Sequence, residues 1–293
     1  MVGTLRRRAE IVRRIRAFFD GRGFVEVETA VRIHAPAPEE HIDCPPVTCG
    51  GEVTYLRASP ELQMKKLLAA GMERLYQIGP CFREGERGSR HNPEFTMLEW
   101  YRREADYSDI RRDLEGLLLE LGVGEGSGVP APAPGFRTLR VRDAFREHAG
   151  WDPWTDWNQD RFDFDMATKV EPAIKAMGGG VFLADYPPQA ASLAKISSPG
   201  GRLPFAERWE FYFEGMELAN CFTELCDGGE QRRRFERARE NRRALGEADY
   251  PLDEEFLASL PLVGSAAGVA LGIDRLVMIL TKVKEISSVR APL

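Results

Sequence analysis

The sequence has few cysteines, no long apolar run and no excess of positive charge, and each absence excludes a class of protein. Five cysteines among 293 residues are too few for a disulfide framework and indicate free thiols in a reducing compartment, so we expect a cytoplasmic protein. No apolar run is long enough to cross a membrane, and the basic N-terminus lacks the apolar core of a signal peptide. The net charge of −6 disfavours broad nucleic-acid binding, which relies on an excess of lysine and arginine.

The composition is that of a soluble globular protein, with 43% apolar and 29% charged residues. A chain of 293 residues can bury a core as one large domain or as two small ones. We expect a single domain over residues 1–293, with a flexible loop rich in glycine and proline at residues 122–135 inside it.

The apolar patterning predicts several helices and strands. An apolar stripe among arginines predicts an N-terminal amphipathic helix, and the alternating run after it predicts a strand. Arginines dominate a late predicted helix; such a run is usually a solvated face interlaced with acids, and a docking surface for an acidic protein or RNA is the alternative. The predicted helices span residues 5–21, 60–70 and 230–243, with a further helical stretch ending at Leu121, and the predicted strands span residues 24–29 and 182–186.

Two regions carry no clear pattern. Residues 30–52 are punctuated by proline and glycine without a period, so we expect a loop there. Residues 136–180 are weakly patterned, and we expect Trp151, Trp154 and Trp157 to pack locally without any chemical role.

The stretch from Arg83 to Arg102 organises the rest of the chain, because it combines charge, glycine and strand patterning. An apolar strand-like run precedes it, and a second strand is expected from Glu94 to Tyr101. The intervening loop is too long for a simple turn, and loops of this length usually have a function. Its glycines allow close backbone approach and its cations supply charge, which suits a polyphosphate. Glu99 and Tyr101 share one face of the strand and together suit an ammonium group.

Ser59 and Pro60 stand where a helix is expected to begin. Capping alone explains both residues, with Ser59 as the N-cap and Pro60 at the first helical position. Glu61 is then a first-turn acid that the helix dipole favours. The alternative is that Ser59 and Glu61 belong to a binding site.

A second hairpin is expected over residues 208–226, with its turn at residues 214–215. This register places Glu210 and Glu217 on one face, where two carboxylates repel each other unless a cation lies between them. Mg²⁺ takes oxygen ligands and bridges phosphates, so it is the natural candidate beside ATP. A solvent-facing sheet with spare acids is the alternative. Glu224 does not fit the strand parity from Glu217, so it joins this face only if a bulge or turn intervenes.

Near the C-terminus, residues 268–278 run from a small-residue strand into a helix. Gly268 and Gly272 let a flat ligand lie against the backbone, and Arg275 emerges at the start of the helix. A tightly packed strand–helix junction explains the same glycines without any ligand.

Taken together, these motifs resemble those of a known family. RHNPEFTMLE at residues 90–99, followed by Tyr101, is similar to motif 2 of the class II aminoacyl-tRNA synthetases, and specifically to the lysine enzymes. GFVEVET at residues 23–29 and GVALGIDRLVM at residues 268–278 resemble their motifs 1 and 3. The three acids spaced seven residues apart, with Asn220 between the second and third, also resemble the lysine enzymes.

From end to end, the chain resembles the truncated paralogues of lysyl-tRNA synthetase that attach (R)-β-lysine to a lysine of elongation factor P. The resemblance implies an α+β fold, the class II synthetase catalytic core, with an antiparallel sheet of about six or more strands flanked by helices. It also implies a homodimer formed through motif 1, where Ala30 stands in place of the family's usual proline. ATP and Mg²⁺ are the implied cofactors, and the implied reaction is activation of the amino acid as an aminoacyl-adenylate.

The resemblance also implies roles for individual residues. Arg83 bridges the substrate carboxylate and the α-phosphate and Arg275 neutralises terminal phosphate, so these arginines are the expected catalytic residues. Glu210 and Glu217 are expected to hold Mg²⁺. The residues expected to bind ATP are Arg83, Glu84, Gly85, Glu86, Arg90, His91, Asn92, Phe95, Glu217, Leu218, Gly272 and Arg275. The residues expected to bind the amino acid are Ser59, Pro60, Glu61, Glu99, Tyr101, Asn220, Glu224 and Ala270.

Three positions bear on how this chain departs from the synthetases. The family reads Arg-x-Glu at the head of motif 2, whereas Arg83 and Glu86 are separated by two residues, so we expect Glu86 to take the role of the displaced glutamate. At Ser59 and Ala270 the synthetases carry alanine and glycine, and the β-lysine ligases carry serine and alanine. One methyl group in a packed pocket is worth about 1–3 kcal/mol of discrimination. Both residues therefore suggest a pocket for a lysine with a shifted amino group, with α-lysine as the alternative substrate.

The expected acceptor is elongation factor P. Motif 1 begins near residue 22, which leaves no room for an anticodon-binding barrel before it, so we expect no stable tRNA binding. Two alternatives remain open. The first is an enzyme of the same fold with another acceptor, either a small tRNA-charging enzyme or another amide-forming ligase. The second is a regulatory paralogue that binds lysine or ATP without turnover. No membrane partner is expected.

Overall fold

A computed structural model describes residues 2–40, 42–123, 136–201 and 203–291 of the chain. Most of the loop predicted at residues 122–135 lies outside the described residues. The chain divides into two compact units. Unit 1 comprises Met1–Glu104, Leu225–Ala266 and Ala270–Leu293, and unit 2 comprises Ala105–Glu224 and Ala267–Val269.

The hairpin predicted around the Arg83 loop is confirmed and forms the centre of unit 1. β5 (Arg74–Phe82) and β6 (Glu94–Arg103) are antiparallel, with Phe82 opposite Glu94 and Leu75 opposite Tyr101. β1 (Val25–Glu26) pairs with β5 in parallel, and it is shorter than the strand predicted over residues 24–29.

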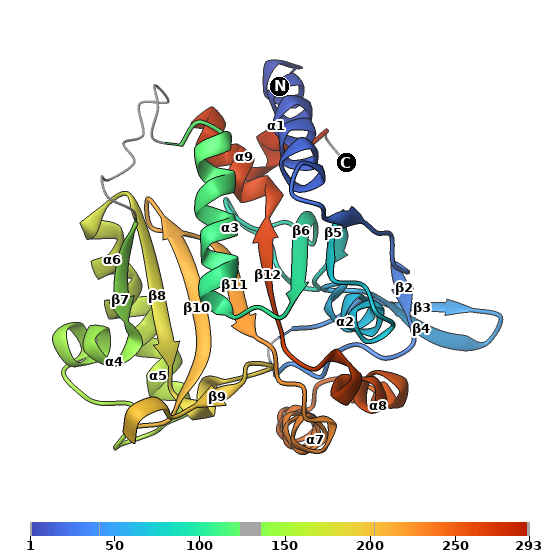
Figure 1. The fold of residues 1–293 in the computed structure, drawn as a ribbon, viewed down its shortest axis with the longest axis vertical. Coiled ribbons are helices and arrows are strands. Elements are labelled where there is room, and N and C mark those ends of the chain that lie inside the picture. The colour runs from blue at the N-terminus through green and yellow to red at the C-terminus, as the bar shows by residue number, and fades with distance from the viewer. Residues whose placement is uncertain (1, 41, 124–135, 202, 292–293) are drawn as a thin grey trace. The chain divides into compact units, whose positions relative to one another are not determined.

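The N-terminal helix α1 (Val2–Asp20) forms as the apolar stripe predicts, because Ile11, Ile15, Phe18 and Phe19 are all buried. The C-terminal helix α9 (Ile273–Thr281) lies beside it in Figure 1 and contacts it. Arg8 Nη1 on α1 donates to Asp274 Oδ1 on α9 at 2.6 Å, and Asp274 Oδ2 accepts from the backbone of Thr96 on β6 at 3.2 Å. This buried carboxylate therefore ties both helices to the hairpin.

The prediction of a loop over residues 30–52 was wrong in part. Three short strands occur in and after this region, and they form a separate sheet in the order β2-β4-β3. Gly50 and Gly51 adopt left-handed backbone angles, with φ of 61° and 86°, and turn β3 back into β4. Strands this short, interrupted by proline and glycine, carry no detectable alternation. The bounds are β2 (Arg32–Ile33), β3 (Pro46–Cys49) and β4 (Glu52–Leu56).

Three further helices complete unit 1: α2 (Glu61–Ala69), α7 (Gly228–Leu245) and α8 (Glu254–Val263), with a short 3₁₀ helix at Ile286–Val289. α2 and α7 both pack against α8. α2 begins one residue later than expected, since Pro60 is its N-cap and not its first residue. The arginines of α7 pair with acids, for example Arg239 with Asp249, which fits a solvated face interlaced with acids.

Unit 2 is built on the second predicted hairpin. Its strands follow the order β11-β10-β8-β7, with β9 paired to β10, and α3 packs on β10 and β11. β7 and β8 are parallel, as are β1 and β5 in unit 1, so the nine strands that include β12 (Ala266–Gly272) are mixed and not purely antiparallel. The bounds are α3 (Tyr107–Glu120), β7 (Arg137–Arg140), β8 (Gly180–Tyr186), β9 (Ile196–Ser197), β10 (Phe205–Phe213) and β11 (Met216–Thr223).

The weakly patterned region of unit 2 is mostly helical, and Figure 1 shows its helices beside β7 and β8. Trp151, Trp154 and Trp157 contribute to one apolar cluster, as expected. π-helical turns interrupt the helices, which disturbs the 3.6-residue period that sequence patterning depends on. The elements are α4 (Val141–Ala144), η1 (Phe145–Ala149), α5 (Gln159–Asp165), η2 (Met166–Val170) and α6 (Glu171–Met177), followed by 3₁₀ turns at Pro188–Ala190 and Pro199–Gly201.

The Arg8–Asp274 pair generates a stability prediction. Asp274 is 2% exposed, so Asp274→Ala leaves the Arg8 guanidinium partly buried without its counterion. Breaking such a pair costs about 3–5 kcal/mol. We expect a fall of that size in the free energy of unfolding, measured by urea denaturation.

Arg7→Ala is the matched control, because it removes the Arg7–Glu10 pair on the exposed surface of the same helix. An exposed pair contributes about 0–1 kcal/mol. Equal losses from the two substitutions would contradict a special role for Asp274.

Candidate functional site

The most unusual group in unit 1 is the carboxylate of Glu99 on β6. It is 1% exposed. Ser59 Oγ donates to Glu99 Oε1 at 2.7 Å, and Tyr101 Oη donates to Glu99 Oε2 at 2.7 Å. The expected shared face of Glu99 and Tyr101 is therefore present. Burial, followed by repulsion from Glu61, raises the pKa of Glu99 to about 7, and the two hydroxyls oppose this rise only in part.

Ser59 joins this carboxylate to the start of α2. Its Oγ accepts from the backbone N–H of Glu61 at 3.0 Å while donating to Glu99. The N-cap predicted at Ser59 was wrong by one residue, since Pro60 is the N-cap, but the Ser59 hydroxyl still binds a backbone N–H of the first turn. The Glu61 carboxylate is held by Lys65 Nζ at 2.5 Å. Ser59, Glu61 and Gln63 line a small cavity of about 20 Å³, room for one water-sized group. Glu61 thus lines the cavity, and the Ser59 hydroxyl connects the same cavity to Glu99.

Arg83 begins the long loop between β5 and β6. Its backbone N–H donates to Pro93 O at 2.8 Å, which closes the base of the loop. Its guanidinium lies 5.2 Å from the centroid of the Phe95 ring and 3.3 Å from Glu86 Oε1. Its Nε is buried and has no hydrogen-bond partner among the described residues. A buried N–H without a protein acceptor can donate a hydrogen bond to an anionic ligand.

Glu86 lies beside Arg83 because of the glycine before it. Gly85 has φ of 79°, a left-handed conformation that a side chain would strain, and the chain turns there. The neighbouring Glu84 is exposed, and its backbone N–H donates to Asp43 O at 2.9 Å. Glu86 is therefore the acid that pairs with Arg83, and its expected role toward ATP stays a prediction.

The tip of the same loop lies against α9. Arg275 Nη2 is 2.7 Å from His91 Nε2, and Arg275 Nε donates to Arg90 O at 3.4 Å. Burial and the Arg275 charge lower the pKa of His91, so a neutral imidazole accepts from the guanidinium. Gly272, the N-cap of α9, lies under Arg275, where an added Cβ would be 3.9 Å from the arginine side chain. The predicted phosphate-binding cations of unit 1 are thus brought together.

In unit 2 the predicted hairpin turn is confirmed, with positive φ at Glu214 and Gly215. Glu210 lies opposite Asn220, and Tyr212 lies opposite Glu217. Glu210 and Tyr212 are two residues apart, so Glu210 and Glu217 share one face as expected.

A β-bulge at Leu218 determines which face of the strand the later residues occupy. Phe211 pairs with Ala219 and Tyr212 pairs with Glu217, which leaves Leu218 without a partner residue. One extra residue returns Asn220 to the face of Glu217, and two-residue steps from Asn220 lead to Glu224. Sequence patterning required such an irregularity for Glu224 and did not locate it.

Arg208 was missed by the sequence analysis. Its Nη2 donates to Glu210 Oε1 at 2.5 Å and its Nε donates to Asn220 Oδ1 at 3.2 Å, while the guanidinium stacks 4.3 Å over the Tyr186 ring. Tyr212 Oη donates to the other Glu210 oxygen at 2.7 Å. A signal existed, since Arg208 is two residues before Glu210 and so shares its strand face.

The oxygen donors of Glu210 and Glu217 suit Mg²⁺ in type, because this ion prefers carboxylate oxygens. Within the described ranges, no group of three or more His, Cys, Asp or Glu residues is arranged to hold a metal. Two carboxylates fit the case in which Mg²⁺ takes its remaining ligands from substrate phosphates and water.

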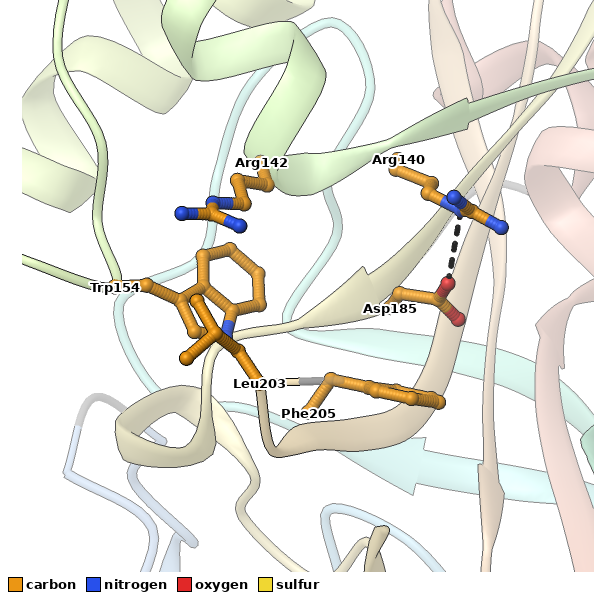
Figure 2. Close-up of a pocket in the computed structure, with 6 residues that line it drawn as sticks. All are labelled: Arg140, Arg142, Trp154, Asp185, Leu203 and Phe205. Atoms are coloured by element: carbon orange, nitrogen blue, oxygen red, sulfur yellow. Dashed lines mark ion pairs between the residues drawn. The ribbon is translucent and has the colours of Figure 1, made fainter. Parts of the chain in front are cut away.

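Another cavity, which lies in unit 2 and measures about 300 Å³, is lined by none of the residues predicted to bind ATP, the amino acid or Mg²⁺ (Figure 2). Arg140 lies 3.3 Å from Asp185 on one side, and Arg142 lies on the other side above Trp154. Asp152 holds Arg142 with hydrogen bonds of 2.7–3.1 Å, so both arginines already have acidic partners. The cavity is lined by Arg140, Arg142, Trp154, Asp185, Leu203 and Phe205.

Comparison with known proteins identifies the family. The family model described as tRNA synthetases class II (D, K and N) matches residues 1–291. The chain belongs to the class II tRNA synthetase family. This confirms the resemblance drawn from the motifs and the α+β fold class. Among the residues that the structure covers, no helix is long and apolar enough to cross a membrane.

Curated members of this family match the chain over almost its full length. A protein of Proteus mirabilis named elongation factor P–(R)-β-lysine ligase is 39% identical over 320 residues, covering 99% of this chain and 94% of the relative. Proteins of the same name from Mannheimia succiniciproducens and Sodalis glossinidius are 38% and 37% identical, again over 99% of this chain and 94% of the relative.

The residues expected from the family fall in both units. Unit 1 carries the Arg83 loop, Arg275 and the Ser59, Glu61, Glu99 and Tyr101 group, and unit 2 carries Glu210, Glu217, Leu218, Asn220 and Glu224. Asn92 is half-buried in the loop, Ala270 is half-buried in β12, and Pro60 is buried at the start of α2. Their contacts with ATP or an amino acid stay predictions.

The raised pKa of Glu99 predicts a pH-dependent stability. Because its pKa rises from 4.5 to about 7, the native state binds a proton that the unfolded chain releases between these values. The wild type should therefore lose stability relative to Glu99→Gln as pH rises from 4.5 to 7, by ~3 kcal/mol. Urea denaturation of both proteins across this range measures the difference. A difference that does not vary with pH would show that Glu99 titrates normally.

Proposed function

We propose that the chain is an ATP-dependent, AMP-forming ligase that activates (R)-β-lysine and transfers it to a lysine side chain of elongation factor P. The observation that carries this proposal is the buried Glu99 carboxylate held by Ser59 and Tyr101, with Glu61 close by. Such a group suits a substrate with two ammonium groups. Relatives that carry the ligase name match 99% of the chain, which supports the same conclusion.

In the first step, the carboxylate of the amino acid attacks the α-phosphorus of ATP, and pyrophosphate leaves. Arg83, whose Nε has no partner among the described residues, orients the two reacting groups and compensates the charge that develops. Arg275, with Arg90 and His91, binds the outer phosphates. Positioning and charge neutralisation carry this chemistry, so no protein nucleophile is required.

The remaining contacts orient each end of the substrates. Phe95 and Arg275 sandwich the adenine ring, and Asn92 and Glu86 lie at its edge. Glu61 receives the amino group nearer the carboxylate. The other ammonium group binds Glu99, Tyr101 and Glu224, and Asn220 assists the carboxylate. A buried ammonium requires partners of this kind, because an unpaired charge is costly.

Glu210 and Glu217 hold Mg²⁺ in this proposal. When bound, the ion neutralises phosphate charge and favours the departure of pyrophosphate. Arg208 and Tyr212 orient the Glu210 carboxylate by donating one hydrogen bond to each of its oxygens. Each oxygen retains a further lone pair, so these bonds orient the carboxylate without exhausting it.

In the second step, the uncharged amine of the acceptor lysine attacks the carbonyl carbon of the adenylate. An amide bond forms, AMP leaves and the amine gives up a proton. We further propose a cytoplasmic homodimer that binds tRNA weakly at most.

The deciding experiment is ATP–pyrophosphate exchange with (R)-β-lysine and with α-lysine, followed by transfer of labelled amino acid to elongation factor P and to tRNA. Exchange that favours β-lysine, with label on elongation factor P, is the expected result. Label on tRNA together with preference for α-lysine would instead identify a tRNA-charging enzyme. Exchange with neither amino acid would leave the regulatory alternative.

Arg275→Ala tests the proposed phosphate site. Removing one preorganised donor to developing charge typically lowers a rate about 10²–10³-fold, so exchange should fall by that factor while the fold persists by circular dichroism. Arg243→Ala on the exposed face of α7 is the control and should retain full exchange. A similar loss in both variants would remove Arg275 from the proposed site.

Ala270→Gly tests the proposed isomer preference. Deleting one methyl group in a packed pocket changes discrimination by about 10–200-fold. The kcat/KM for (R)-β-lysine divided by that for α-lysine should decrease by a factor in this range, and the KM for ATP should stay unchanged. An unchanged ratio would show that Ala270 does not select the isomer.

A further inference from the structure

A buried cation contacts one of the two proposed amine-binding acids. Lys65 is one helical turn after Glu61 on α2, is 1% exposed, and places its Nζ 2.5 Å from Glu61 Oε1. An ammonium at this depth is costly unless a carboxylate compensates it. None of the roles assigned above involves Lys65.

We propose that Lys65 is a positioning residue that keeps Glu61 ionised and oriented, and that it sets the charge of this pocket to accept a diammonium amino acid. This inference rests on the proposed function, because it takes Glu61 and Glu99 as the acceptors of the two ammonium groups. The geometry provides the reason, since the Ser59 hydroxyl donates to the Glu99 carboxylate and accepts from the backbone N–H of Glu61, while Lys65 Nζ contacts the Glu61 carboxylate.

The charged neighbours of the two acids are few among the described residues. Arg57 precedes α2 and attracts the Glu99 carboxylate electrostatically. Its guanidinium donates to the backbone carbonyls of Thr29, Ala30 and Pro80 and not to Glu99. Ser59 and Tyr101 are neutral donors to Glu99. The other titratable groups nearby are Cys81 on β5, which interacts with Glu99, and Glu39 and Cys44, which line the cavity. Lys65 is the cation that contacts Glu61 directly.

The charge count then fits one class of substrate. Glu61, Glu99 and Lys65 together carry one negative charge when both acids are ionised. An amino acid with two ammonium groups and one carboxylate carries one positive charge. Without Lys65, the half-buried Glu61 carboxylate would have the Glu99 carboxylate as a neighbour and no cation of its own, which disfavours ionisation of Glu61. A protonated Glu61 accepts an ammonium group poorly.

Lys65→Met should therefore raise the KM for the amino acid at least tenfold at pH 7 while leaving the KM for ATP within twofold. The rise of kcat/KM for the amino acid with pH should move to higher pH than in the wild type, because Glu61 must now ionise without its partner. A residue with only a structural role would not move this profile. Lys65→Arg, which keeps the charge, should restore much of the wild-type profile.

Lys66→Met is the matched control. Lys66 is the next residue of α2, and it pairs with Asp253 and Glu255 of α8 at 2.8 Å and not with the pocket. Its substitution removes an equal charge and a similar side chain from the same helix. Both KM values and the pH profile should stay within twofold of wild type.

Thermal unfolding gives a second readout that needs no activity. In Lys65→Met the unpaired Glu61 has a raised pKa in the folded state, so stability falls as pH rises above the unfolded value. The loss of Tm should be several degrees larger at pH 8 than at pH 5. Adding Glu61→Gln to Lys65→Met should remove this extra pH dependence, because the carboxylate that lost its cation is then absent.

The outcomes separate this inference from the proposed function. Wild-type exchange with β-lysine, together with equal behaviour of Lys65→Met and Lys66→Met, would overturn the inference and leave the function standing. No wild-type exchange with either lysine would remove the function and the diammonium role together. The Tm series would still decide the Lys65–Glu61 pairing, and a pH-independent loss that Glu61→Gln fails to relieve would overturn it.

Discussion

A carboxylate that leaves water must find donors inside the protein, and this requirement shapes three acids of the candidate site. Glu99 has two hydroxyl donors, Glu61 has a buried lysine, and Glu210 has an arginine and a tyrosine. Asp274, which ties α1 and α9 to the hairpin, has an arginine and a backbone N–H. Acids fixed in this way are oriented before any substrate arrives, so binding does not have to order them.

The kind of donor matters as much as its presence. Glu99 receives neutral hydroxyls, and burial consequently raises its pKa to about 7. Glu61 and Glu210 each receive a cationic donor instead. A pocket that mixes the two kinds can gain charge at Glu99 when an ammonium group enters, while Lys65 holds the Glu61 carboxylate in place. This combination suits a substrate with two amino groups better than a pocket lined by two acids alone.

Backbone irregularities decide which side chains share a face in unit 2. The tight turn at Glu214 and Gly215 fixes the register of β10 against β11, and the bulge at Leu218 then shifts it by one residue. Without the bulge, Asn220 would point away from Glu217. In unit 1 the left-handed Gly85 has a comparable effect, since it allows the chain to bring Glu86 back to Arg83.

Elements with local signals could be predicted from the amino-acid pattern. The apolar stripe of α1, the hairpin around the Arg83 loop and the shared face of Glu99 and Tyr101 all depend on periodicity within one element, and the motifs were specific enough to identify the family. The folded chain was needed to reveal the bulge at Leu218, the strands within residues 30–52, and the contacts of Arg208 and Lys65 with their acids. A bulge exists only relative to a partner strand, and a buried ion pair only where packing excludes water, so neither has a period along the chain that patterning can detect.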